Sequence, residues 1–180
     1  MCKLWHVCRY LLTYIPYLFN DINIERGILV STKILYIDMD DVLADFKAGI
    51  YTHVAEYPYT FIPQSKIGFF KNLEPICGAI DAVNQLRKNN LFDVHILTAP
   101  STRNPHSYTE KRLWVEKYFD YDFTDKLIIC SNKALLKGDY LVDDNASGKG
   151  QENFEGEFIH FGSHIFPDWD AVVRYLGDIR

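Results

Sequence analysis

An apolar segment that ends abruptly in carboxylates constrains this chain more than any other feature. The residues from Lys33 to Asp38 are predicted to form a buried strand, and Asp40 follows after a single intervening residue. Burying unpaired carboxylates costs several kcal/mol unless a cation or hydrogen bonds compensate for the lost water. We therefore interpret the two acids as part of a magnesium and phosphate site at the carboxyl end of a parallel strand.

The size and charge of the chain limit the kind of protein that can carry such a site. With 180 residues, of which 48% are hydrophobic, the chain can bury one sizeable core, so one domain with an insertion is expected. A net charge of -5 argues against binding to a nucleic-acid polymer, because such binders carry an excess of basic residues. A nucleotide substrate is compatible with this charge, since a metal ion can neutralise its phosphate.

Residues 1–32 are predicted to be an appendage of unknown role, and the catalytic domain is assigned to residues 33–180. The apolar stretch 10–19 is interrupted by Pro16 and is shorter than the roughly 20 residues of a membrane span, so no stable span is expected. A packed helix, a disordered leader and an extension without function are all left open. The four cysteines lack the spacing of a zinc site and indicate reduced thiols in a cytoplasmic protein: Cys2, Cys8, Cys77 and Cys130.

Beyond residue 32 the chain alternates between strand-like and helix-like segments. After the first strand, the predicted strands are residues 93–98, 127–130, 140–142 and 157–161, and the predicted helices are residues 80–88, 107–118 and 168–176. Ser107 and Glu110 have the spacing of a capping box, which predicts that the middle helix begins there. The alternation predicts an α/β fold, a doubly wound parallel sheet with helices on both faces.

One segment, about residues 47–72, interrupts this alternation and is predicted to form a small helical cap inserted after the first strand. It is rich in aromatic residues and contains Pro58 and Pro63 as helix breakers. Because it follows the first two acids directly, it should lie over the carboxyl edge of the sheet, where open α/β folds bind ligands. Its aromatic side chains fit either a lid that closes over substrate or the small core of a helical hairpin.

The carboxylates fit transfer of a phosphate group to an acid side chain. An ionised Asp38 can attack phosphorus, and Asp40 can give a proton to the leaving alkoxide and later take one from water. Two close carboxylates near a cation have pKa values that are driven apart, which separates these roles. Oxygen ligands from Asp38, from the backbone carbonyl of Asp40 and from the pair Asp143-Asp144 would hold Mg²⁺.

Residues at the ends of later strands supply the phosphate contacts. The hydroxyl of Thr98 and the following backbone N–H groups, beginning with that of Ala99, can bond phosphate oxygens. Lys133 is the cation that can balance the charge of nucleophile and phosphate in the transition state. Each residue alone is a weak signal, but their order and placement at strand ends indicate one site.

These residues resemble the four motifs of the haloacid dehalogenase superfamily of phosphatases, and the closest branch is the 5'(3')-deoxyribonucleotidases. The resemblance extends over roughly residues 33 to 176 and is carried by the stretches DMDDVLADF, NLEPICGA, LTAP, EKRLWVEKYF and DYLVDDN. It implies a magnesium-dependent phosphomonoesterase that forms an aspartyl-phosphate on Asp38 and acts on deoxyribonucleoside monophosphates such as dUMP and dTMP. It also implies that Phe46 lines the nucleotide pocket and that Asp144, with Asp143, binds the metal.

The chain departs from that branch at three places. Asp41 stands where vertebrate-type members carry glycine, and Ala99 replaces a hydroxyl residue that would also contact phosphate. The insertion at 47–72 is shorter than the cap of the family, which supplies the aromatic residues that contact the base. The catalytic part of the resemblance is unaffected by these differences, but base and sugar preference does not follow from it.

Other classes of protein fit the sequence less well. A receiver-type signalling domain would need a phosphorylated Asp at the end of a strand before Thr98, and the strand that follows the first one ends in Thr98 itself. A scaffold that had lost its activity would be expected to lack Asp38, Asp40 or Lys133, and all are present. A related phosphatase for another small phosphoester is the main alternative. The oligomeric state is left open, with a homodimer as one option.

Overall fold

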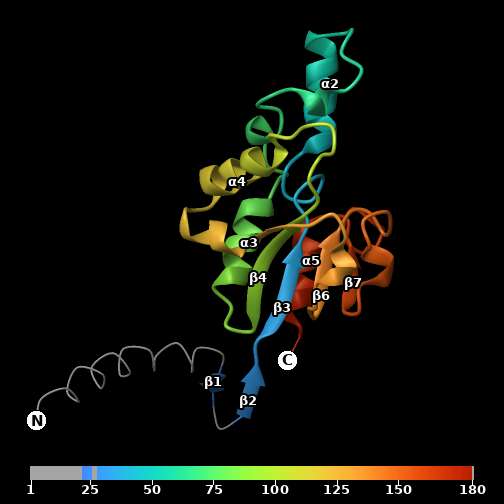
Figure 1. The fold of residues 1–180 in the computed structure, drawn as a ribbon. Helices are drawn as coiled ribbons and strands as arrows, with labels where there is room; N and C mark the ends of the chain where they lie inside the picture. The colour runs from blue at the N-terminus through green and yellow to red at the C-terminus, as the bar shows by residue number, and fades with distance from the viewer. Residues whose placement is uncertain (1–21, 26–27, 180) are drawn as a thin grey trace, which may run out of the picture.

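The computed structural model describes residues 22–25 and 28–179, and its centre is a five-stranded parallel sheet (Figure 1). The strands are β3 (Lys33–Ile37), β4 (Phe92–Thr98), β5 (Leu127–Ile129), β6 (Tyr140–Asp143) and β7 (Glu157–His160). Their order in the sheet is β5-β4-β3-β6-β7, so the chain starts in the middle, builds outward to β5 and then builds the other half. This confirms the predicted doubly wound sheet, and the change of direction lies between β3 and β6.

Helices cover both faces of the sheet, but unequally. The main helices are α3 (Ala79–Arg87), α4 (Ser107–Tyr118) and α5 (Trp169–Gly177), and the short 3-10 helices η4 (Asp122–Lys126), η5 (Lys133–Leu135) and η6 (Gln151–Asn153) lie between strands. The three α-helices pack with Leu35 and Ile37 of β3 in the larger core. The smaller core contains Tyr36 of the same strand and is covered by Leu136 and Phe154, which directly follow η5 and η6. Because successive strand residues point to opposite faces, one strand serves both cores.

The predicted capping box at the start of α4 is wrong, although the extent of the helix is as predicted. Ser107 is the first helical residue, and its hydroxyl accepts the backbone N–H of Ser101 at 3.1 Å. Glu110 is buried and accepts the backbone N–H groups of Gly68 and Phe70 at 2.6 and 3.0 Å. A buried carboxylate needs strong partners, and the inserted segment above the helix supplies them. Glu110 therefore joins α4 to the cap.

The inserted segment consists of α2 (Phe46–Glu56), η2 (Pro63–Ser65) and η3 (Phe70–Asn72), and it projects beyond the carboxyl edge of the sheet (Figure 1). Asp45 caps α2 by accepting the backbone N–H of Ala48 at 2.9 Å. A Cβ atom at Gly49 would lie 2.3 Å from Cδ2 of Leu73, so a larger residue at this position requires the Leu73 side chain to shift. None of the residues of α2 is buried.

The aromatic residues of the cap divide into two groups. Phe69 and Phe70 are buried and pack edge to face, with 5.2 Å between their ring centroids. Tyr51, Tyr59 and Phe61 are 73%, 92% and 97% exposed. The interpretation of the aromatic residues as a small hairpin core therefore applies only to the first group, and the second group faces solvent.

The described part of the first 32 residues is a pair of antiparallel strands, β1 (Ile22–Glu25) and β2 (Ile28–Ser31). This two-stranded sheet is separate from the five-stranded sheet. The apolar stretch 10–19 lies outside the described residues. Within the described ranges, no helix combines the length and the apolar character needed to cross a membrane.

Candidate active site

The carboxyl edge of the sheet brings most of the predicted site residues together. Asp38 directly follows β3, Thr98 is the last residue of β4, and Asp143 is the last residue of β6. The backbone N–H of Asp38 donates to the carbonyl of Val142 at 2.8 Å, which aligns the ends of β3 and β6. Asp38 and Asp143 therefore lie at the ends of neighbouring strands, at the change of direction of the sheet.

Lys133 lies between two of these acids. Its side chain is 2% exposed, and its ammonium group is 2.7 Å from Asp38 Oδ1 and hydrogen-bonded to Asp143 Oδ2. Burial acts to lower the pKa of Lys133, but the charges of Asp38 and Asp143 outweigh it, so the pKa is raised. Lys133 therefore carries a fixed positive charge directly beside the first carboxylate.

The two acids after β6 have different surroundings. Asp143 is fully buried and accepts hydrogen bonds from Lys133, from Gln151 at 3.1 Å and from the backbone N–H of Asn145 at 2.9 Å. Asp144 is partly exposed, and the side-chain amide of Asn145 donates to it at 2.7 Å. The carboxylate of Asp144 therefore has fewer partners inside the protein.

The residues Asp38, Asp143 and Asp144 fit a divalent cation. Each offers a carboxylate oxygen, and these oxygens all lie within 4.8 Å of one another. Burial, together with the charges of Asp38, Asp143 and Asp41, raises the pKa of Asp144 to about 6. Carboxylate oxygens clustered in this way suit a hard cation such as Mg²⁺.

Asp40 has one paired and one unpaired carboxylate oxygen. Its Oδ2 lies 2.8 Å from the ammonium group of Lys111, whereas its Oδ1 is buried without a hydrogen-bond partner in the described part of the chain. Burial and the neighbouring charge of Asp38 raise the pKa of Asp40, although Lys111 acts in the opposite direction. A raised pKa and a free oxygen suit a carboxyl group that carries a proton.

Lys111 is a site residue that the sequence interpretation missed. Its side chain is fully buried in α4, and its ammonium group donates to Thr98 Oγ1 at 2.7 Å as well as to Asp40. It shares the buried face of α4 with Trp114 and Val115, at spacings of three and four residues. A lysine on the apolar face of a predicted helix was the available signal, because such a residue needs a buried partner.

Phe46 begins α2 above the carboxyl edge, and Ala99 directly follows Thr98. The ring of Phe46 is partly exposed and stacks on that of Phe70, with 6.1 Å between centroids and 28° between planes. The methyl side chain of Ala99 can donate no hydrogen bond. Its contribution to phosphate binding is therefore limited to its backbone N–H.

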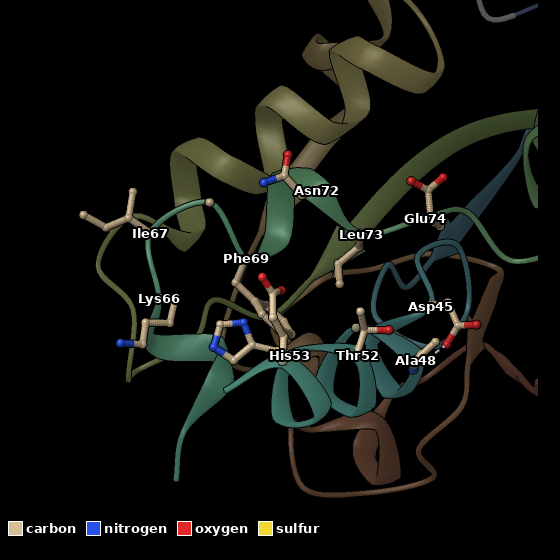
Figure 2. A pocket seen from close by; sticks show the side chains of 13 residues that line it. Asp45, Ala48, Thr52, His53, Lys66, Ile67, Phe69, Asn72, Leu73 and Glu74 are labelled. Atoms are coloured by element: carbon tan, nitrogen blue, oxygen red, sulfur yellow. Dashed lines mark hydrogen bonds between the residues drawn. The ribbon is translucent and has the colours of Figure 1, made fainter. Parts of the chain in front are cut away.

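A cavity of about 450 Å³ lies in the cap and is distinct from this site (Figure 2). It is open to solvent and lies between α2 and the segment 66–74, with His53 and Lys66 at one end and Asp45 and Glu74 at the other. None of the acids at the carboxyl edge lines it. The cavity is therefore separate from the carboxylates at the edge of the sheet.

The carboxyl edge of this doubly wound sheet carries an acid pair after the first parallel strand, a strand-end threonine, a buried lysine and a second acid pair. This combination defines a phosphoric monoester hydrolase of the haloacid dehalogenase superfamily. A family model described as "5' nucleotidase, deoxy (Pyrimidine), cytosolic type C protein" matches residues 54–168. The chain belongs to this family.

Comparisons with individual relatives agree with this assignment. A protein of Vibrio phage KVP40 that is predicted to be a 5'(3')-deoxyribonucleotidase is 41% identical over 159 residues, covering 85% of this chain and 89% of the relative. The human cytosolic-type 5'(3')-deoxyribonucleotidase is 32% identical over 172 residues, covering 79% of each chain. The human mitochondrial 5'(3')-deoxyribonucleotidase is 30% identical over 146 residues, covering 64% of each.

Replacing Lys111 with methionine is expected to lower kcat for phosphate release by about a hundredfold. The change keeps the buried volume but removes the cation beside Asp40 and the donor to Thr98. The rate is compared with that of Lys117→Met, which changes an exposed lysine of the same helix. Thermal unfolding of each variant shows whether it is folded. A folded Lys111→Met enzyme with the wild-type kcat would contradict a role in the site.

Proposed function

We propose that the protein removes phosphate from deoxyribonucleoside 5'- and 3'-monophosphates, with dUMP and dTMP as preferred substrates, in a magnesium-dependent reaction. The observation that carries this proposal is the carboxylate of Asp38 held at 2.7 Å from a buried ammonium group, with Asp40 two residues away. The nucleotide part of the proposal is supported by the named activities of the relatives.

Asp38 is the nucleophile in this proposal. Its carboxylate oxygen bonds to phosphorus while the bond from phosphorus to the nucleoside oxygen breaks, which leaves an aspartyl-phosphate. The charge of Lys133, 2.7 Å from Asp38, stabilises the negative charge of the phosphoryl group in the transition state. Water then attacks the aspartyl-phosphate, which releases inorganic phosphate and restores Asp38.

Asp40 moves the proton in both steps. In the first step it gives a proton to the leaving nucleoside oxygen, and in the second it takes a proton from the attacking water. Its unpaired Oδ1 is the atom available for this transfer, because Oδ2 is held by Lys111. The raised pKa of Asp40 favours the protonated state that the first step requires.

Thr98 and Lys133 bind the phosphate, together with the backbone N–H of Ala99. The ammonium group of Lys111 donates to the oxygen of Thr98, so the hydroxyl proton of Thr98 is left to donate to a phosphate oxygen. Lys111 therefore contacts both Asp40, which moves the proton, and Thr98, which binds the phosphate. Phe46, with its partly exposed ring above the edge, is proposed to contact the nucleoside.

Mg²⁺ would be held by Asp38, Asp144 and the backbone carbonyl of Asp40. Asp144 is assigned as the direct ligand of the second acid pair, because Asp143 already accepts three hydrogen bonds, including one from Lys133. Asp143 is proposed to support the metal site mainly by its charge and by positioning Lys133. When bound, the cation would neutralise charge on the phosphate oxygens.

The domain organisation and the location of the protein are also part of this proposal. Residues 33–180 form the catalytic domain, the segment 47–72 acts as its cap, and residues 1–32 lie outside the catalytic machinery. The free thiols of Cys77 and Cys130 fit a cytoplasmic enzyme. Light scattering of the purified protein would distinguish a monomer from a homodimer.

A phosphate-release screen tests the choice of substrate. Purified enzyme is given dUMP, dTMP, the matching ribonucleotides, deoxyribose 5-phosphate and p-nitrophenyl phosphate, with Mg²⁺ or with EDTA. The deoxypyrimidine monophosphates are expected to show the highest kcat/KM, and EDTA is expected to abolish turnover. If they rank no higher than the simple esters, the enzyme is a phosphatase for another small phosphoester and the nucleotide assignment is wrong.

A further inference from the structure

The loop between β3 and α2 carries a charged contact that the proposed chemistry does not use. Asp41 binds Lys47 of α2, and Lys47 in turn reaches Asp144. We propose that Lys47 is a built-in counter-cation of the metal site, held in place by Asp41, and that it weakens the binding of Mg²⁺ to the enzyme without substrate. This inference rests on the proposed metal site.

The backbone conformation of Asp41 indicates that its side chain makes a specific interaction. Asp41 has a φ of +57°, and it is the only residue other than glycine with a positive φ in the described part of the chain. This left-handed conformation disfavours residues that carry a Cβ atom, and glycine would adopt it without strain. An aspartate here is explained if its carboxylate contributes an interaction that glycine cannot.

That interaction is a two-point contact with a single residue. Asp41 Oδ1 accepts the backbone N–H of Lys47 at 2.9 Å, and Asp41 Oδ2 lies 3.3 Å from the ammonium group of Lys47. The first contact fixes the start of α2 relative to the catalytic loop. The second holds the flexible lysine side chain over the carboxyl edge of the sheet, although this side chain is 67% exposed.

From this position Lys47 reaches the metal site. Its ammonium group lies 3.6 Å from Asp144 Oδ2. Among the described residues, only Lys133 and Lys47 form ion pairs with the three acids of the proposed metal site. Lys133 is buried beside Asp38, whereas Lys47 is largely exposed and contacts Asp144 from the solvent side.

A positive charge at this distance opposes a divalent cation. A unit positive charge close to a bound Mg²⁺ would repel it, even in a water-like medium, enough to change its affinity by about tenfold. The exposed side chain of Lys47 can turn away from Asp144 while it keeps its contact with Asp41. Lys47 therefore weakens the binding of Mg²⁺ but does not prevent it.

The test is the binding of Mg²⁺ measured by isothermal titration calorimetry without any nucleotide. Lys47→Met is expected to lower the Kd for Mg²⁺ by about tenfold, and Lys47→Arg is expected to keep the wild-type value. Lys66→Met, which changes an exposed lysine elsewhere in the cap, should also keep it. In an Asp41→Asn background the effect of Lys47→Met should fall below about threefold, because Lys47 is then no longer held at the site.

Three results would overturn the inference. An unchanged or raised Kd for Mg²⁺ in Lys47→Met would show that Lys47 does not oppose the metal. An unchanged Kd together with a raised KM for dUMP would make Lys47 a substrate-binding residue instead. Absence of Mg²⁺ binding in all variants would remove the metal site itself, whereas a failure of the nucleotide screen alone would leave the calorimetric result intact.

Discussion

Replacing Asp38 with asparagine is expected to reduce phosphate release from every substrate by about a thousandfold or more. The amide is a poor nucleophile, so no aspartyl-phosphate can form. The two side chains have nearly the same shape, and Lys133 keeps its contact with Asp143, so the fold should persist. The measurement is the initial rate of phosphate release with saturating Mg²⁺, together with thermal unfolding of the variant.

Asp81→Asn serves as the matched control for this experiment. Asp81 is an exposed acid in the first turn of α3, and its replacement removes the same charge away from the site. Its rate should equal that of the wild type. Turnover by a folded Asp38→Asn enzyme at the rate of this control would show that Asp38 is not the nucleophile.

Replacing Lys133 with methionine is expected to have the largest effect on stability. The change leaves the buried carboxylates of Asp38 and Asp143 without their shared cation, and breaking a buried ion pair in this way costs about 3–5 kcal/mol. The phosphoryl charge also loses its counter-ion, so kcat should fall by at least about a hundredfold. Urea unfolding gives the free energy of unfolding, and added Mg²⁺ should restore part of the lost stability.

The control for this prediction is an ion pair near the opposite end of the same sheet. Lys126 lies 2.8 Å from Asp93, and both side chains are about 40% exposed. Lys126→Met should therefore cost no more than about 1 kcal/mol. Equal stability losses in the two methionine variants would mean that Lys133 does not compensate a buried charge.

The fold and the outline of the site could be predicted because both depend on features local to short segments. The buried strands are apolar runs, and parallel strands place their carboxyl ends at one edge. Asp38, Thr98 and Asp143 therefore had to lie near one another once the strands were recognised. The helices that follow these strands are also close to their predicted bounds.

The parts that could not be predicted depend on contacts between residues far apart in the chain. Lys111 pairs with Asp40 across 71 residues, and Glu110 binds Gly68 across 42. A capping box is defined by sequence spacing alone, so it cannot reveal that Glu110 is drawn into a buried contact with the cap. The role of Asp41 is hidden for the same kind of reason, because it depends on backbone geometry and on how α2 leaves the loop.

Trapping the phosphorylated enzyme tests the central claim most directly. Wild-type protein and Asp38→Asn are mixed with radiolabelled dUMP and Mg²⁺, quenched in acid within milliseconds, and digested for peptide mapping. The expected result is a hydroxylamine-sensitive phosphoryl group on the wild-type peptide that contains Asp38, and no label in the variant. Label on a different residue, or an equal amount of label in Asp38→Asn, would contradict the proposed mechanism.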